Sequence, residues 1–260
     1  MSRINFLMLG ICLFFSQSVF AGEDKEHDRL VKELMSKSGL AKQISSIPDY
    51  IQGGLLQAQQ QNGKLSQAEL NKLGGIMADA YDAKKLVSDA EHHIKLKLSS
   101  SDIHPVLEWL NSDLGKKITR YEEEASSADA AQKIMVIAGD LANQDQKRLQ
   151  KIADLDDVIR GTGSTVTLIQ GIQIAMTMGM MSGMPENERM SLDQLTKRVK
   201  SSSEQLYNVY KPQVLASFLY SYRDLTAAEI EQYIKFSTTQ PAVKYHAVSF
   251  DAIGVAMGKA

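Results

Sequence analysis

The sequence has little of what small extracellular domains and many metalloproteins depend on. Cysteine occurs once in 260 residues, at Cys12, and proline occurs five times. A single cysteine excludes an intramolecular disulfide and a multi-cysteine metal site, so apolar packing must hold the fold together. Few prolines and few β-branched runs leave room for long helices. The formal net charge of −2 gives no global attraction to nucleic acid or to an anionic membrane.

The first 21 residues have the pattern of a secretory signal peptide. Arg3 supplies a positive start, residues 4–15 form an apolar run, and Ala21 ends a small-residue cleavage site. The run is shorter than the ~20 residues that span a bilayer. We therefore predict cleavage after Ala21 and a periplasmic or secreted mature protein. Lipidation of Cys12 is the weaker alternative, because the bulky Ile11 stands where a small residue is expected.

Apolar residues recur at helical spacing along most of the mature chain, which predicts an all-α fold of helical bundles with long amphipathic helices. The expected helices cover approximately residues 28–39, 40–47, 48–61, 66–97, 99–114, 127–160, 166–181 and 191–222. Thr226 opens a further helix, and Pro241 allows a break before a final segment that reaches Val255. Residues 161–164, Gly-Thr-Gly-Ser, are expected to stop one helix and cap the next. The helix at 166–181 is apolar nearly all round, and its two glutamines favour a protein core over a bilayer.

One helix-opening phrase occurs twice, 127 residues apart. Residues 98–103, Leu-Ser-Ser-Ser-Asp-Ile, recur as residues 225–230, Leu-Thr-Ala-Ala-Glu-Ile. In each copy a hydroxyl residue can cap a helix, an acid three residues later can reach back to the cap amide, and the flanking apolar pair forms a hydrophobic staple. Two further boxes, opened by Ser66 and Ser191, lie 125 residues apart.

These matches predict a tandem duplication. Residues 51–53 and 169–171 share the sequence Ile-Gln-Gly at a shift of 118, and the shift changes only between expected helices. Drifting shifts of this kind are typical of loop insertions in a repeated fold. We expect a helical unit at 22–126 and a second at 127–260. A single irregular bundle with ordinary capping boxes is the alternative.

The phrase and the residues after it resemble a secreted bacterial helical domain of unknown function. The family signature runs Leu, Ser or Thr, two variable residues, Glu, an aliphatic residue, and then an aromatic, Ser-Pro, Gly and Lys. The first copy matches at Leu98, Ser99, Asp102, Ile103, Trp109, Ser112, Gly115 and Lys117, and the second at Leu225, Thr226, Glu229, Ile230, Phe236, Thr239 and Lys244. Asp113 in the first copy and Gln240 in the second replace the proline, and in the second copy Ala242 replaces the glycine. The resemblance implies an exported helical protein and no catalytic residue.

The candidate metal ligands are weak. His92 and His93 are adjacent, and adjacent helical residues point about 100° apart, so both cannot bind one ion from a regular helix. His27, His104 and His246 are scattered, and surface positions are expected for all five histidines. Met176 and Met180 share a helix face and could bind Cu(I) as thioethers, but core packing is the favoured interpretation.

Other polar groups give no catalytic pattern. The acids at 154, 156 and 157 lack the spacing of a calcium loop and are expected on a solvated helix face. The glycines at 161 and 163 lack the Lys-Ser/Thr ending of a phosphate loop. Tyrosines at 207, 210, 220 and 222 are expected to be half-buried core residues.

The sequence therefore favours a non-enzymatic binding or interaction protein of the cell envelope. Its partner would be an unknown envelope protein or a small apolar ligand, with no nucleic acid and no cofactor. A hydrolase or metal-dependent enzyme, with its site assembled between the two units from residues such as Asp89 and the histidines, is the first alternative. A lipid- or membrane-associated protein that uses the helix at 166–181 is the second.

Overall fold

The computed structural model describes residues 16–62, 66–181 and 184–259, and these residues form helices and connecting turns without a strand. The all-α prediction is confirmed. The helices are α1 (Ser16–Lys37), α2 (Leu40–Ser45), α3 (Ile47–Asn62), α4 (Gln67–Ala80), α5 (Ala83–Lys97), α6 (Ser100–Asn111), α7 (Asp113–Ala125), α8 (Ala128–Gly139), α9 (Gln146–Ile159), α10 (Gly161–Met181), α11 (Leu192–Lys200), α12 (Ser203–Ser221), α13 (Ala227–Ser237) and α14 (Gln240–Lys259). Short 3-10 segments lie at Leu141–Asn143 and Glu186–Glu188.

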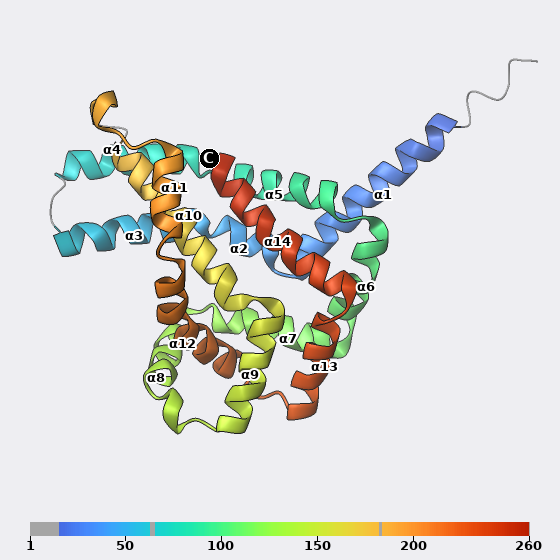
Figure 1. Ribbon diagram of the computed structural model, residues 1–260. Helices are drawn as coiled ribbons and strands as arrows, with labels where there is room; N and C mark the ends of the chain where they lie inside the picture. The colour runs from blue at the N-terminus through green and yellow to red at the C-terminus, as the bar shows by residue number, and fades with distance from the viewer. Residues whose placement is uncertain (1–15, 63–65, 182–183, 260) are drawn as a thin grey trace, which may run out of the picture.

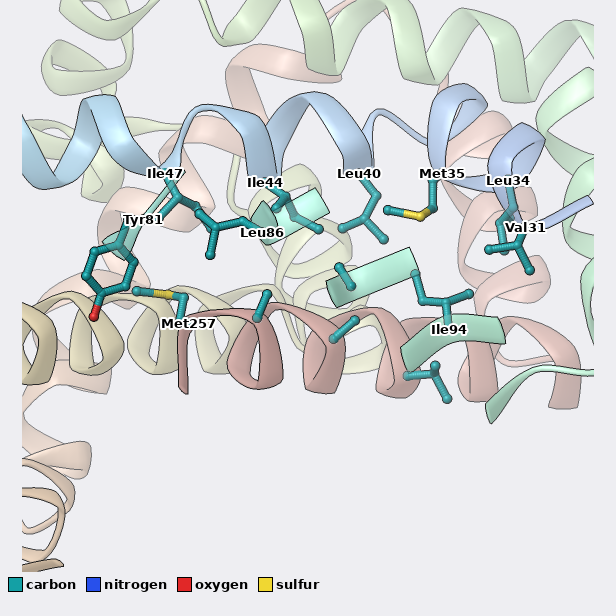
Figure 2. Close-up of a cluster of buried hydrophobic side chains, with 14 of the residues drawn as sticks. Val31, Leu34, Met35, Leu40, Ile44, Ile47, Tyr81, Leu86, Ile94 and Met257 are labelled. Carbon is teal, nitrogen blue, oxygen red and sulfur yellow. The ribbon is translucent and has the colours of Figure 1, made fainter. Parts of the chain in front are cut away.

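The helices form two layers that α10 connects (Figure 1). The first layer contains α1 to α6 together with the C-terminal α14, which lies beside α5. Buried side chains from α1, α2, α3, α5 and α14 meet in its core (Figure 2). Ile44, Leu86 and Ile94 are fully buried there. The last helix of the chain thus completes a core that is otherwise built mainly from the N-terminal half.

The second layer has its own hydrophobic core. This core takes buried side chains from α7, α9, α12 and α13, with Tyr222 just after α12 and Leu225 just before α13. Phe236 on α13 packs against both cores, and Trp109 on α6 packs against the second. α7 therefore belongs to the second core and α14 to the first, so each core takes helices from both predicted units.

Three predicted capping boxes form as the sequence indicates. Ser99, Ser191 and Thr226 each accept a hydrogen bond from the amide three residues later, and the side chain of that later residue reaches back to the cap amide. The staple residues Leu98 and Leu225 are both buried. The fourth expected box opens at Ser66, and its staple residue Leu65 lies outside the described residues.

Each of the three longest predicted helices is divided into two helices in the structure, so the prediction of continuous helices was wrong. Residues 66–97 divide into α4 and α5 because Asp82 caps a new helix by accepting from the amide of Lys85. Residues 127–160 divide into α8 and α9, and Asp145 caps the second of these. Residues 191–222 divide at Ser202 into α11 and α12. Asp82 and Asp145 satisfy free amides and so stabilise the first two breaks, whereas Ser202 makes no side-chain cap and its hydroxyl donates to the Val199 carbonyl.

The turn between α9 and α10 also differs from expectation. Arg160, rather than a glycine, adopts the left-handed conformation (φ 56°) that ends α9, and α10 already begins at Gly161. The expected solvated Asp156 is 1% exposed. Its carboxylate accepts hydrogen bonds from the amide (2.7 Å) and the hydroxyl (2.6 Å) of Thr162. Asp156 therefore caps the start of α10 from inside the protein.

The predicted signal peptide falls largely outside the described residues, which start at Ser16. Cleavage after Ala21 stays a prediction. Within the described part of the chain, no helix is both long enough and apolar enough to cross a membrane.

Candidate functional site

A central cavity of about 390 Å³ lies between the two hydrophobic cores. Side chains of α6, α7, α10, α12, α13 and α14 line it, and both predicted sequence units contribute. Most of the wall is apolar, and Val106, Leu110, Leu168 and Ile253 contribute to it. Small-molecule sites are commonly concave spaces of roughly 300–1,000 Å³ with apolar walls and a few polar groups. The cavity has this character.

An aromatic stack forms one wall of the cavity. The rings of Trp109 and Phe236 lie nearly parallel, with centroids 4.4 Å apart and an interplanar angle of 6°. Tyr233 lies on the same stack, 5.8 Å from Trp109. These rings join α6 to α13, so aromatic packing fixes the separation of the two helices at the cavity.

Two reciprocal ion pairs join α6 to α14 and α7 to α13. Lys244 at the start of α14 donates to Asp102 of α6 at 2.5 Å, and Lys117 of α7 donates to Glu229 of α13 at 2.7 Å. Partial burial opposes the ionised form of Asp102, but hydrogen bonds from Lys244 and Ser99 prevail and lower its pKa to about 2. Hydrogen bonds from Lys117 and the Thr226 amide lower the pKa of Glu229 to about 2. Both acids therefore serve as helix caps and as interhelical partners.

The main polar group of the cavity is Glu122, on the inner face of α7. Its Oε1 accepts hydrogen bonds from the hydroxyls of Tyr222 (2.6 Å) and Tyr233 (3.4 Å). Tyr222 is fully buried and Tyr233 is 8% exposed. Burial raises the pKa of Glu122, and the two tyrosine hydrogen bonds partly oppose this rise because they stabilise the carboxylate.

His246 on α14 lines the cavity from another side. Its Nε2 is buried and has no hydrogen-bond partner within the described part of the chain. Burial lowers the pKa of His246 to about 4, so the imidazole is neutral at neutral pH. The ring stacks obliquely on Tyr245, 5.3 Å away. The cavity is thus lined by one acid and by a neutral histidine whose Nε2 is itself buried.

The cavity extends in two directions. Glu122, Ser217 and Phe218 also line a wider pocket of about 650 Å³ toward α2 and α3. Ser164, Leu168 and Ile253 also line a pocket of about 330 Å³ between α10, α11 and α14, whose walls are mainly apolar. Glu122 therefore lies where the first two spaces meet, and a ligand bound there has apolar room beyond the central cavity.

The predicted histidine and acid candidates do not gather at this cavity. His92 and His104 are exposed, whereas His27 hydrogen-bonds Ser100 and the Lys95 carbonyl. His93 is half-buried, and its buried Nε2 has no hydrogen-bond partner among the residues described. The surface expectation is therefore wrong for His27, His93 and His246, which are half-buried. Asp89 is half-buried on α5. No group of three or more His, Cys, Asp and Glu side chains suited to a metal ion occurs in the described residues.

The predicted thioether pair lies in two different environments. Met176 is half-buried, packs against the first core and comes close to Gly54, where a Cβ would lie 3.5 Å from its sulfur. Met180 is 47% exposed. Core packing therefore describes Met176 and not Met180.

Sequence reasoning missed Glu122 and Tyr233 as site residues. A signal for Glu122 was present, because it follows Ile118 by four residues and Gly115 by seven, and both of these are buried on the inner face of α7. The run of three glutamates hid this position. No sequence signal indicated that Tyr233, Tyr245 and His246 would face Glu122 across one cavity.

Comparisons with protein-family models, curated proteins and solved structures found no match to this chain. The resemblance to the secreted helical domain therefore stays a proposal that depends on the signature residues alone.

Proposed function

We propose that this protein is an exported, non-enzymatic binding protein that holds a small ligand with an apolar body in the central cavity. The observation that carries the proposal is the cavity itself, which has apolar and aromatic walls and a few inward polar groups. Its volume of about 390 Å³ lies within the range of small-ligand sites, roughly 300–1,000 Å³.

A hydrolase is the second candidate, because Glu122 and His246 line the same cavity between the two cores. Nucleophilic catalysis depends on a base that is hydrogen-bonded to its nucleophile. In the described structure Nε2 of His246 has no such partner, and Oε1 of Glu122 accepts from tyrosine hydroxyls. This arrangement supports ligand recognition more than hydrolysis.

The duplication is part of the proposal, and the helices around the cavity support it. Asp102 and Glu229 are 127 residues apart, as are Lys117 and Lys244, and each acid pairs with the lysine of the other copy. The stacked Trp109 and Phe236 have the same spacing. Two copies of a helical hairpin related by an approximate twofold axis would give this reciprocal pattern, with the cavity formed between them.

Double-mutant cycles with alanine test the equivalence of the two ion pairs. The pairs Asp102–Lys244 and Lys117–Glu229 are partly exposed, so each cycle is expected to give a favourable coupling of about 0.2–1 kcal/mol. Urea unfolding of the single and double variants measures the couplings. Couplings of opposite sign for the two pairs would contradict the equivalence.

Binding of the neutral fluorescent probe N-phenyl-1-naphthylamine tests the function. The wild type is expected to bind it saturably, and Thr119→Phe, which adds a ring to the cavity wall, should weaken binding about tenfold or more. Leu96→Phe is the matched control because Leu96 is 67% exposed on α5, and it should leave binding unchanged.

Absence of saturable binding in the wild type would overturn the proposed function, as would a folded Thr119→Phe variant with unchanged affinity. The thermal transition of each variant shows whether it is folded. N-terminal sequencing of the mature protein tests export, and the chain should begin at Gly22.

A further inference from the structure

Glu122 is a half-buried carboxylate that lines the cavity and is hydrogen-bonded only by neutral groups. Tyr222 and Tyr233 both donate to Oε1, and Oε2 has no hydrogen-bond partner among the described residues. An ionised carboxylate away from water is costly unless a charge partner or several hydrogen bonds stabilise it. Oε1 is thus held by the protein, and Glu122 lines both the central cavity and the wider pocket, which are large enough for a ligand.

The cationic side chains near α7 are engaged elsewhere. Lys117 pairs with Glu229, and Arg223 pairs with Glu124 and Asp224. Lys42 lines the adjoining wider pocket, but its side chain is exposed. In the described part of the chain, no lysine, arginine or histidine forms an ion pair with Glu122.

The other titratable groups at the cavity do not supply a positive charge either. Tyr222 and Tyr233 are buried and Tyr245 is half-buried, and loss of hydration raises the pKa of each and keeps the phenols neutral. His246 is neutral at neutral pH because burial lowers its pKa. Glu123, next to Glu122, is exposed. The cavity therefore contains a carboxylate whose charge the protein does not balance.

We propose that the ligand is an organic cation, an amine or quaternary ammonium compound with an apolar body, whose charged nitrogen lies against Glu122. This inference rests on the proposed binding function and names the chemistry of its ligand. The apolar body would lie against Val106, Leu110 and Ile253, with further apolar room in the adjoining pocket beyond Leu168. A cation that enters a low-dielectric cavity gains strongly from a fixed carboxylate and supplies the missing counter-charge.

Other ligand classes fit the cavity less well. An anion would place a second negative charge beside Glu122, and like charges at short distance repel strongly in a low-dielectric site. Lys200, which lines the adjoining apolar pocket, has an exposed side chain and does not neutralise the charge of Glu122. A neutral ligand would fill the apolar space but leave the carboxylate without a counter-charge.

Displacement of N-phenyl-1-naphthylamine by three matched probes tests the inference. The probes are benzyltrimethylammonium, its neutral isostere neopentylbenzene and the anion 3-phenylpropionate. We expect the cation to bind about tenfold or more tightly than the isostere, and the anion to bind most weakly.

Glu122→Gln should abolish most of the preference of the cation over its isostere, because the amide retains the shape and the acceptor oxygen but not the charge. Glu123→Gln is the matched control, since it removes the neighbouring, exposed carboxylate, and it should keep the preference.

The pH dependence gives a readout on the wild type that needs no variant. The quaternary ammonium does not titrate, so its affinity should fall as Glu122 is protonated. Because burial raises the pKa of Glu122, this loss should begin at a higher pH than for an exposed glutamate. Binding of the neutral isostere should be unchanged over the same range, as His246 stays neutral above its pKa of about 4.

The outcomes distinguish a failure of the inferred preference for a cation from a failure of the proposed binding function. Equal binding of cation and isostere, preference for the anion, or a preference that survives in a folded Glu122→Gln variant would overturn the inference and leave the proposed function standing. Failure of the naphthylamine to bind would overturn both. If Glu122→Gln does not fold, the affinities of the three probes for the wild type and their pH dependence still test the inference.

Discussion

Replacement of Trp109 by alanine is expected to lower the free energy of unfolding by about 3 kcal/mol, the lower end of the range for a truncated core aromatic, because the ring already borders a cavity. Trp109 stacks on Phe236 and Tyr233 and thereby joins α6 to α13. Truncation removes the shared face of both stacks and enlarges the cavity into a space that the surrounding helices only partly fill. Equilibrium urea unfolding measures the loss.

The control for this prediction is the truncation of an apolar side chain on the protein surface, Leu96. Leu96 is 67% exposed, and Leu96→Ala should change the free energy of unfolding by less than about 0.5 kcal/mol. Trp109→Phe keeps a ring in the stack and should recover most of the lost stability. A Trp109→Ala variant as stable as the wild type would show that the stack does not hold the two cores together.

Replacement of Gly161 by alanine is expected to destabilise the protein by about 1–3 kcal/mol, as overpacking of a close contact does. A Cβ at this position would lie 2.8 Å from Cζ of Phe218 and 2.9 Å from Oδ1 of Asp156. Asp156 cannot move away without losing its hydrogen bond to the Thr162 amide. Thermal and urea unfolding of the variant measure the effect.

Gly163, two residues further along α10, provides the matched control. A Cβ there has no atom within 4 Å outside its own helix neighbourhood, so Gly163→Ala should keep or raise stability, by up to about 1 kcal/mol, through better helix propensity. Equal effects of the two substitutions would show that the close approach of Asp156 and Phe218 does not require the glycine at 161.

The local elements of this fold could largely be predicted from the sequence. Ser99 with Asp102 and Thr226 with Glu229 form the predicted capping boxes, because a capping box depends only on residues within one helical turn. The breaks at Asp82 and Asp145 were missed, although each has an ordinary capping side chain. At these positions apolar periodicity continued through the break, and periodicity outweighed the cap in the prediction.

The candidate site could not be predicted in the same way. Glu122 lies 100 residues from Tyr222 and 111 from Tyr233, and their hydrogen bonds depend on the packing of α7 against α12 and α13. The burial of Asp156 could not be predicted either. The charge pattern predicted that Asp156 faces solvent, whereas in the fold it is buried and accepts a hydrogen bond from Thr162. A charge run shows which residues are polar, but only the neighbouring helices determine which one of them is enclosed.

The sequence by itself determined the all-α class, the helix starts with capping boxes at Ser99, Ser191 and Thr226, and the repeated phrase at 98–103 and 225–230, since each depends on contacts within a few residues. Only the tertiary structure decided that α14 completes the first core and that Glu122 lines the central cavity. It also decided that each capping acid pairs with the lysine of the other copy, Asp102 with Lys244 and Glu229 with Lys117. The physical reason is that these features come from segments far apart in the chain, whose approach is set by the summed burial of many apolar side chains rather than by any local signal.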